Sequence, residues 1–159
     1  MIFLPLVVTA ILVVIDQITK YIALSSLKPI GSMTFIKGFM DFTFVENRGA
    51  AFGILEGQRW FFVVATIVIS VAIIYAFIKM PKKNEYKYMK VALVLILAGA
   101  FGNVIDRLFR GYVVDFFEFT FIDWPVFNVA DIYVVVGTII FAFLILFVIK
   151  DEPKNNKKG

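Results

Sequence analysis

The 159-residue chain contains neither cysteine nor histidine. Without cysteine it can form no disulfide, and it has no thiol nucleophile and no cysteine-based metal site. Without histidine it has no imidazole base, which excludes a Ser-His-Asp triad and an HExxH zinc site. Any acid–base chemistry must therefore use carboxylates, lysine, tyrosine or water. The residues present imply neither a metal nor an organic cofactor.

Charge is scarce over four long stretches of the chain. Hydrophobic residues make up 61% of the sequence, which is far above the share in a soluble domain. A helix needs about 20 predominantly apolar residues to cross a bilayer, and residues 2–27, 60–80, 88–109 and 126–149 each provide such a stretch. We therefore expect an all-α membrane protein, a bundle of four transmembrane helices in a single domain over residues 1–150, with a polar tail at 151–159.

The positive charges predict how the helices are oriented. Residues 79–90 hold five lysines and one glutamate, and residues 150–159 hold four lysines. Positively charged connections stay in the cytoplasm, so this connection, both termini and the tail are expected to be cytoplasmic. The connections at 28–59 and 110–125 then face outward. The net charge of +4 thus has a membrane explanation and does not indicate nucleic-acid binding.

Polar residues interrupt three of the apolar segments near their outer ends, whereas the inner halves of the segments are almost purely apolar. Ionisable residues inside a membrane segment are costly, tend to face the bundle interior and often mark function. We expect them to form one cluster at the outer boundary of the bilayer. The residues are Asp16, Lys20, Asn103, Asp106, Arg107, Asn128 and Asp131.

The two outward connections have more structure-forming residues than plain linkers. The run FMDFTFVE (39–46) partly alternates apolar and polar residues, which predicts a strand or hairpin. The run GAAFGIL (49–55) predicts a short helix lying at the membrane interface. The connection at 110–125 is rich in aromatic and β-branched residues, which favour headgroup depth. We therefore expect a small extracytoplasmic β element and a short interfacial helix.

Asp115 and Asp131 are the strongest candidates for catalysis. If the last helix begins near Val126, Asp131 lies about 8 Å along its axis, where helix capping explains it less well than a functional role. Asp115 lies between two outer helix ends and is flanked by apolar residues, so the chain could fold it back toward Asp131. A solvated loop acid is the alternative for Asp115. Two carboxylates that share a site hold one proton between them, and such a pair can activate a water molecule. Which acid carries the proton stays open, because the pair titrates as a unit.

The remaining polar residues near the helix ends have structural alternatives. Asn128 shares a helix face with Asp131, and capping explains it equally well. Asp16 and Lys20 have the i,i+4 spacing of an intrahelical ion pair, which supports the fold or contacts substrate.

Further polar residues are expected around the acid pair. Asn103, Asp106 and Arg107 either tie loops and helices together there or form a polar cluster at a helix end. Asn47 and Gly49 offer an amide and a close backbone approach, or an ordinary turn.

Five ordered blocks resemble the signature of the bacterial lipoprotein signal peptidase family, also called signal peptidase II. They are DQITK (16–20), ENRGAAFGIL (46–55), AGAFGNVIDR (98–107), VVDF (113–116) and FNVADIYVVVG (127–137). The resemblance implies an intramembrane aspartic endopeptidase that removes the signal peptide from diacylglyceryl-modified prolipoproteins, cutting just before the lipidated cysteine. The catalytic acids of the family match Asp115 and Asp131. Its supporting residues match Asp16, Lys20, Asn47, Asn103, Asp106, Arg107 and Asn128. One departure is Ala98, where many members have the first of two adjacent glycines.

The resemblance also implies a location and an inhibitor. Family members reside in the bacterial cell membrane with the active site at the extracytoplasmic face, and a β-sheet cradle and an amphipathic helix cover the membrane surface. They are inhibited by the cyclic peptide globomycin, which implies a groove for an extended peptide. Nothing in the sequence requires more than a monomer.

Two other kinds of function are compatible with buried charges in a membrane protein. A proton- or ion-coupled carrier would use them as a relay, but its pathway should continue toward the inner face, where polar residues are lacking. A structural membrane subunit would pair Asp131 with a lysine of its partner. Cleavage of a lipidated precursor distinguishes the peptidase from both.

Overall fold

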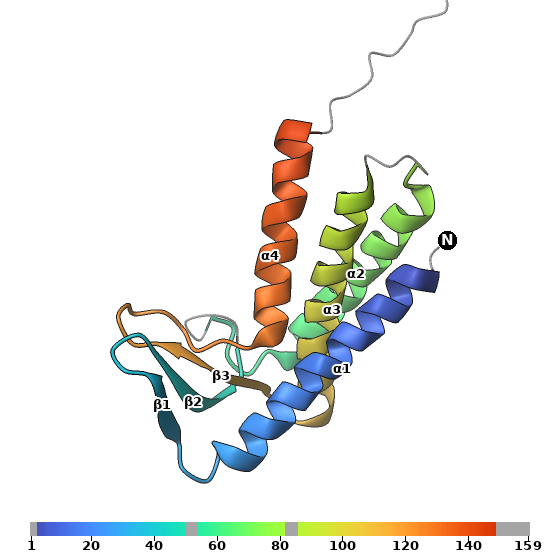
Figure 1. Ribbon diagram of the computed structural model, residues 1–159. Coiled ribbons are helices and arrows are strands. Elements are labelled where there is room, and N and C mark those ends of the chain that lie inside the picture. The colour runs from blue at the N-terminus through green and yellow to red at the C-terminus, as the bar shows by residue number, and fades with distance from the viewer. Residues whose placement is uncertain (1–2, 50–53, 82–85, 149–159) are drawn as a thin grey trace, which may run out of the picture.

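Four long helices and a small sheet make up the computed structural model, which describes residues 3–49, 54–81 and 86–148. The helices are α1 (Phe3–Ser26), α2 (Arg59–Lys79), α3 (Lys87–Phe109) and α4 (Val129–Phe143), and a π-helical segment (Leu144–Val148) continues α4. The strands are β1 (Ser32–Ile36), β2 (Met40–Asn47) and β3 (Val113–Phe119) (Figure 1). Within the described residues, four helices are long and apolar enough to cross a membrane. The prediction of a four-helix membrane bundle with a small β element is confirmed.

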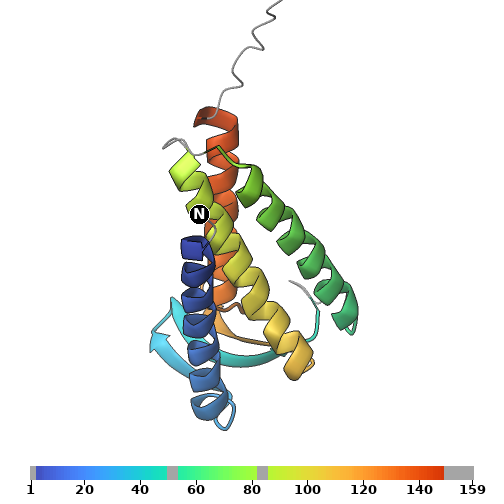
Figure 2. The same cartoon turned by 90° about the vertical axis from the view of Figure 1, so that its right-hand side faces the viewer.

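Helix α3 lies at the centre of the bundle and contacts each of the other three helices (Figure 2). Half of its apolar span is buried inside the protein, against 17% for α1 and α2 and 11% for α4. The other helices leave large apolar side chains exposed along most of their length. Such all-round apolar surfaces suit contact with lipid. Helix α3 therefore provides the scaffold on which the polar residues of the neighbouring elements converge.

The three strands form an antiparallel sheet in the order β1-β2-β3. Strands β1 and β2 are joined by a tight turn at Gly38, whose φ of +73° is a conformation that glycine adopts without strain. The FMDFTFVE run lies almost entirely in β2, as predicted. Strands β2 and β3 pair with a register shift between Phe42 and Val45, which places Val45 opposite Asp115. The sheet was expected from the first outward connection alone, so the third strand is an addition to the sequence-based prediction.

Alternation along β3 divides its side chains between two environments. Val114 and Phe116 are buried against Ala23 and Leu27 near the end of α1, so the sheet is fixed to that helix. Asp115, which lies between these two residues, belongs to the other face of the strand. In Figure 1 the sheet lies beside the end of the bundle where α1 ends and α4 begins. We call this the site end.

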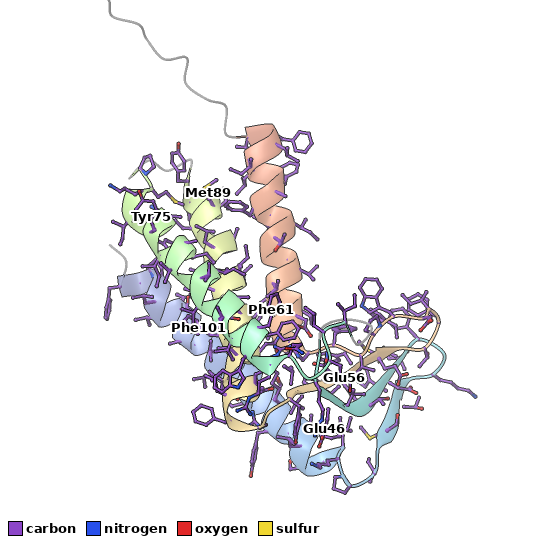
Figure 3. The ribbon with its side chains drawn as sticks, turned by 180° about the vertical axis from the view of Figure 1, so that it is seen from behind. Glu46, Glu56, Phe61, Tyr75, Met89 and Phe101 are labelled. Carbon is purple, nitrogen blue, oxygen red and sulfur yellow. The ribbon has the colours of Figure 1, made fainter. Side chains whose placement is uncertain are left out.

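The opposite end of the bundle holds the start of α1, the end of α2, the start of α3 and the end of α4 (Figure 1). Its core is an apolar cluster built from Ile73, Met89, Leu93, Leu97 and Leu144. Figure 3 shows Tyr75 and Met89 at this apolar end and Glu46 and Glu56 at the site end.

The structure differs from the sequence-based prediction at the start of α4. Helix α4 begins at Val129, so the predicted start at Val126 was wrong by three residues. The reason is that Phe127 is extended and exchanges backbone hydrogen bonds with Phe117 of β3, an arrangement that apolar character alone does not distinguish from a helix. The predicted interfacial helix at 49–55 falls mainly on residues 50–53, which lie outside the described residues, as does the polar tail at 151–159.

Candidate active site

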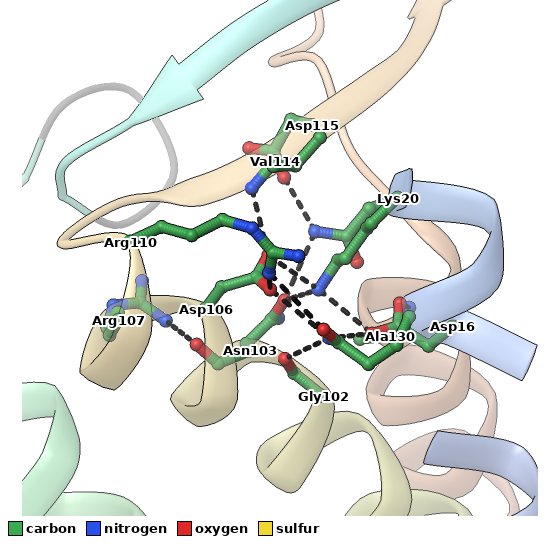
Figure 4. A network of polar contacts seen from close by, with 12 residues as sticks. Asp16, Lys20, Gly102, Asn103, Asp106, Arg107, Arg110, Val114, Asp115 and Ala130 are labelled. Carbon is green, nitrogen blue, oxygen red and sulfur yellow. Dashed lines mark hydrogen bonds and ion pairs between the residues drawn. The ribbon is translucent and has the colours of Figure 1, made fainter. Parts of the chain in front are cut away.

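The predicted polar residues meet at the site end, although they come from α1, β2, α3, β3 and α4. Figure 4 shows Asp16 and Lys20 of α1 facing Asn103 and Asp106 of α3, with Asp115 of β3 close by. Most of these side chains are inaccessible to solvent. The exposed fraction is zero for Asp16, Lys20, Asp106 and Asn128, and 1% for Asp115. Buried polar groups at this density must be hydrogen-bonded to one another to be tolerated.

Asp115 is held by two asparagine amides. Asn47 Nδ2 donates to Asp115 Oδ2 at 2.8 Å, and Asn128 Nδ2 donates to Asp115 Oδ1 at 2.6 Å. The sheet register places Asn47 next to Asp115, because Val45 is the pairing partner of Asp115. Burial raises the pKa of Asp115 to about 7, and the nearby charge of Asp131 adds to the rise. A carboxyl group with this pKa exchanges its proton readily near neutral pH.

Asp131 lies in the first turn of α4 and takes part in a capping box. Asn128 is the N-cap, its Oδ1 accepts from the Asp131 amide, and Asp131 Oδ2 accepts from the Asn128 amide, both at 3.0 Å. Helix capping therefore explains Asp131 as well as Asn128. The expectation that capping is a weaker explanation for Asp131 was wrong, because α4 starts three residues later than predicted. Capping leaves Asp131 Oδ1 for another donor, Asn103 Nδ2, at 2.8 Å.

Asn128 connects the two candidate acids directly. Its side-chain oxygen accepts from the Asp131 amide in the α4 cap. Its side-chain NH₂ group donates to Asp115 Oδ1 at 2.6 Å and to Asn103 Oδ1 at 3.1 Å. Asp115 and Asp131 are 16 residues apart in sequence, and they meet around one amide side chain. The sequence-based expectation that the chain folds Asp115 back toward Asp131 agrees with this geometry.

A buried ion cluster supports the acid pair from α1 and α3. Lys20 Nζ lies 3.0 Å from Asp16 Oδ2 and 3.2 Å from Asp106 Oδ2. Each of these acids also accepts a backbone amide: Asp16 Oδ1 from Ala130 at 2.9 Å, and Asp106 Oδ2 from Val114 at 3.1 Å. The two amides belong to the residues that directly precede Asp131 and Asp115. The ion cluster therefore fixes the backbone beside each candidate catalytic acid.

Two members of this cluster were not among the predicted site residues. Gln17 Nε2 donates to Gly102 O at 3.1 Å and to Asp106 Oδ1 at 3.2 Å. Arg110 donates to Gln17 Oε1 at 3.2 Å and forms an ion pair with Asp106. The signals that could have identified them are the polar Gln17 inside an apolar segment and the i,i+4 spacing of Asp106 and Arg110.

Arg107 links α3 to the segment that follows β2. Its Nη2 donates to Gly49 O at 2.8 Å, and its guanidinium lies 4.3 Å from the centre of the Phe62 ring on α2. Both candidate acids act on it electrostatically. Asn47 Oδ1 accepts from the Gly49 amide at 2.9 Å, which is the contact of an ordinary turn. The same side chain donates to Asp115, so Asn47 fulfils both sequence-based alternatives.

Close helix packing brings the start of α4 onto α3. A Cβ atom at Gly102 would lie 2.5 Å from Asp16 Oδ2, and one at Gly99 would clash with Ala130 O. Ala98, the departure from the family pattern, is completely buried. The glycines of the AGAFGN block therefore create the space in which α1 and α4 meet α3.

The arrangement offers paired carboxylates with amide donors, which suits proton transfer to and from water. Across the described residues, no group of three or more His, Cys, Asp or Glu side chains is arranged to hold a metal ion. The fold and the site together define a class: a multi-pass membrane protein whose buried carboxyl groups gather at one end of a four-helix bundle.

Comparisons with known proteins identify the family. Residues 8–147 match the family described as Signal peptidase (SPase) II, so the chain belongs to the signal peptidase II family, as the five sequence blocks predicted. The lipoprotein signal peptidase of Caldanaerobacter subterraneus subsp. tengcongensis is 49% identical over 91% of this chain and 97% of its own length. That of Clostridium acetobutylicum is 43% identical, over 97% and 99%.

Solved structures agree with this assignment. A bacterial membrane enzyme determined by the in meso method at 2.3 Å resolution is 38% identical, with a TM-score of 0.83 over all of this chain and 94% of that chain. A second, determined at 1.9 Å, is 39% identical, with a TM-score of 0.82 over 94% of this chain and 96% of that chain. The chain is thus a membrane-embedded enzyme of an aspartic peptidase family.

Proposed function

We propose that the enzyme removes the signal peptide from diacylglyceryl-modified prolipoproteins, cutting just before the lipidated cysteine, with Asp115 and Asp131 as the catalytic dyad. One observation carries the proposal: Asn128 donates to Asp115 and caps the helix turn that holds Asp131, so two acids from separate elements share one amide. The name lipoprotein signal peptidase, given to relatives at 49% and 43% identity, supports the substrate class.

The dyad holds one proton between its two carboxyl groups and activates water. The ionised acid takes a proton from a water molecule, whose oxygen attacks the carbonyl carbon of the scissile bond. The protonated acid hydrogen-bonds the carbonyl oxygen as negative charge develops there. When the tetrahedral intermediate collapses, the C–N bond breaks and the leaving nitrogen receives a proton from the dyad. The pKa of about 7 at Asp115 suits a group that gives and regains a proton in each cycle.

The site end is the extracytoplasmic end in this proposal. Lysine-rich residues 79–90 and 150–159 favour a cytoplasmic location for the apolar end and for both termini. The signal helix of a substrate lies in the bilayer, and acyl chains hold its lipidated cysteine at the surface. The scissile bond is then at headgroup depth, where water is available. A globomycin-type cyclic peptide would compete for the same place, and a monomer provides every proposed catalytic residue.

Cleavage of a lipidated precursor by the purified enzyme tests the proposal. We expect the wild type and Asp123→Asn, an exposed acid outside the network, to release a product whose mass places the new N-terminus at the lipidated cysteine. Asp115→Asn and Asp131→Asn should be folded and inactive. A folded wild type that leaves the precursor intact, or a dyad variant with full activity, would refute the proposal. Equal cleavage of an unlipidated precursor would refute the lipid requirement.

A further inference from the structure

The Asn103 amide occupies a junction between the ion cluster and the acid pair. Its Oδ1 accepts from Lys20 Nζ at 2.8 Å and from Asn128 Nδ2 at 3.1 Å, and its Nδ2 donates to Asp131 Oδ1 at 2.8 Å. Among the described residues, Asn103 is the nearest polar partner of Lys20, since the distances from Lys20 Nζ to Asp16 and Asp106 are 3.0 Å and 3.2 Å. Lys20 therefore neutralises the two acids of the ion cluster and also binds Asn103, which contacts Asp131.

The chemistry of an ammonium group determines which way this amide points. Lysine has three donors and no acceptor, so the atom of Asn103 that faces Lys20 has to be the oxygen. The NH₂ group then faces Asp131. The reversed orientation would place NH₂ against the ammonium and the carbonyl oxygen against the carboxylate, and both contacts would be repulsive. Asn128 Nδ2 and Asp131 Oδ1 favour the same orientation, and the ammonium group of Lys20 adds a full positive charge on the oxygen side, which an uncharged side chain at position 20 would remove.

The orientation has a consequence for the charge of the dyad. Asp131 Oδ1 accepts from Asn103 Nδ2, and Oδ2 accepts from the Asn128 backbone amide at 3.0 Å. A cation on the Asn103 oxygen polarises the amide and strengthens its N–H donors. Asp131 also lies in the first turn of α4, where the helix dipole favours negative charge. Asp115 accepts two amide donors as well, but both are side chains, and it lies on a strand, whereas Asp131 is part of the helix turn and accepts a backbone amide.

We propose that Lys20 is a positioning residue for the reaction: by donating to Asn103 Oδ1 it holds the Asn103 NH₂ group on Asp131, which makes Asp131 the ionised acid and leaves the shared proton on Asp115. The inference rests on the proposed dyad and assigns its two roles. Asp131 is the base that takes the proton from water, and Asp115 donates to the carbonyl oxygen.

Arg110 provides the matched comparison. It pairs with Asp106 in the same ion cluster but has no contact with Asn103 among its described hydrogen bonds, which go to Asp106 and Gln17. A residue that only stabilises the cluster should resemble Arg110 in its effects. A residue that acts through Asn103 should lose its effect when Asn103 is removed.

The test compares Lys20→Met, Arg110→Met, Asn103→Leu and the double variant Lys20→Met/Asn103→Leu, with kcat and KM measured on the lipidated precursor across pH. We expect Lys20→Met to lower kcat by up to roughly 10²-fold, the low end of what a general acid or base contributes, and to leave KM within about twofold, as for loss of an interaction made in the transition state. Arg110→Met should lower kcat less than Lys20→Met does and should leave the acidic limb of the pH profile unmoved, because it disturbs the cluster without touching Asn103. The double variant should be no slower than Asn103→Leu, because the two side chains act in series.

The acidic limb of the pH profile gives a readout that a structural role would not change. Loss of Lys20 weakens the donor on Asp131, so the limb should move to higher pH, and it should not move further in the Asn103→Leu background. The other charged groups near Asp131, which are Asp115 and Arg107, are unchanged in all four variants. The charge of Lys20 also acts directly on Asp115. Its loss should change the alkaline limb with or without Asn103, so this effect can be distinguished from the effect that passes through Asn103. Multiplicative losses in the double variant, or an unmoved acidic limb, would overturn the inference.

Lys20→Met leaves two buried acids without their shared cation, so a measurement on the wild-type side chain complements it. With ¹⁵N-asparagine labelling, the Asn103 NH₂ resonance is assigned by its loss in Asn103→Leu. We expect it to shift as pH falls through the acidic limb, and the shift should be absent in Asp131→Asn. A titration that persists in Asp131→Asn would show that the amide does not face Asp131. Failure of the wild type to cleave its precursor would refute the proposed function and leave this orientation intact.

Discussion

The two ends of the bundle are stabilised in different ways. At the apolar end, Ile73, Leu93 and Leu144 pack with few directional constraints, and lipid outside the bundle is as apolar as the core inside it. At the site end, Lys20 has fixed partners on α1 and α3, and Asn128 has fixed partners on α3, β3 and α4. Packing at one end holds the helices together, whereas hydrogen bonds at the other determine where particular atoms lie. Substitutions at the two ends should therefore separate stability from turnover.

The largest contrast should come from Asp131→Asn and Leu93→Ala. Asp131→Asn keeps the volume of the side chain but removes the proposed base, so kcat should fall by roughly 10³-fold or more with the protein still folded. Leu93 is 5% exposed, so Leu93→Ala should lower the free energy of unfolding by about 2–5 kcal/mol. It should leave the kcat of the folded fraction unchanged. Thermal unfolding in detergent and active-site-normalised kcat measure both quantities. Comparable losses of kcat in the two variants would contradict the division between the ends.

A pair of glycine substitutions should sharpen the same contrast. A methyl group at Gly102 would lie 2.5 Å from Asp16 Oδ2, next to the ion cluster, whereas one at Gly137 would meet Ala92 O at 2.8 Å within the apolar packing of α3 and α4. Both variants should lose stability, by about 1–3 kcal/mol for overpacking. Only Gly102→Ala should also lower kcat in the folded fraction, because displacing Asp16 moves the Ala130 amide beside Asp131. If Gly137→Ala lowers kcat equally, the helix contact itself controls turnover.

Asn47→Ala should have a smaller effect on turnover. It removes one of the two amide donors to Asp115 and leaves the Asn128 donor in place, so kcat should fall about tenfold, equivalent to about 1.4 kcal/mol. Thr43→Ala, on the same strand but bonded to Ser32 and Glu118, is the control and should retain wild-type kcat. Steady-state cleavage of the lipidated precursor compares the two variants, and an unchanged rate for Asn47→Ala would remove Asn47 from the site.

A further difference should be a pH dependence of the free energy of unfolding that arises at the site end. The pKa of Asp115 is raised to about 7 in the folded protein by burial, and in the unfolded chain it returns to about 3.9. The folded state therefore binds the extra proton, and stability should decrease as pH rises from about 4 to 7 and then level off. Asp115→Asn should abolish this slope, as seen in thermal unfolding at several pH values. A slope that persists in the variant would assign it to other groups.

The same contrast explains what the sequence could predict. Apolar runs located all four helices, because a bilayer requires about 20 apolar residues for each crossing. The depth of Asp16, Asn103 and Asp131 along those runs predicted that they meet at one end. Alternation in FMDFTFVE predicted β2.

Contacts between distant segments limited the prediction. Phe127 pairs with β3, so α4 starts late, and no local pattern distinguishes such a pairing from a helix start. The direction of the hydrogen bond from Lys20 to Asn103, 83 residues apart, depends on three-dimensional placement. Arg110 is different, because its ion pair with Asp106 has a local i,i+4 signal, and only its contact with Gln17, 93 residues away, depends on three-dimensional placement.

Asn128 begins α4 and donates to Asp115 through the same side chain. A substitution there would disturb the helix terminus and the dyad together. Because the side chain is completely buried, its replacement by any residue without both an acceptor and a donor would leave a polar partner unsatisfied on α4 and on β3 at the same time.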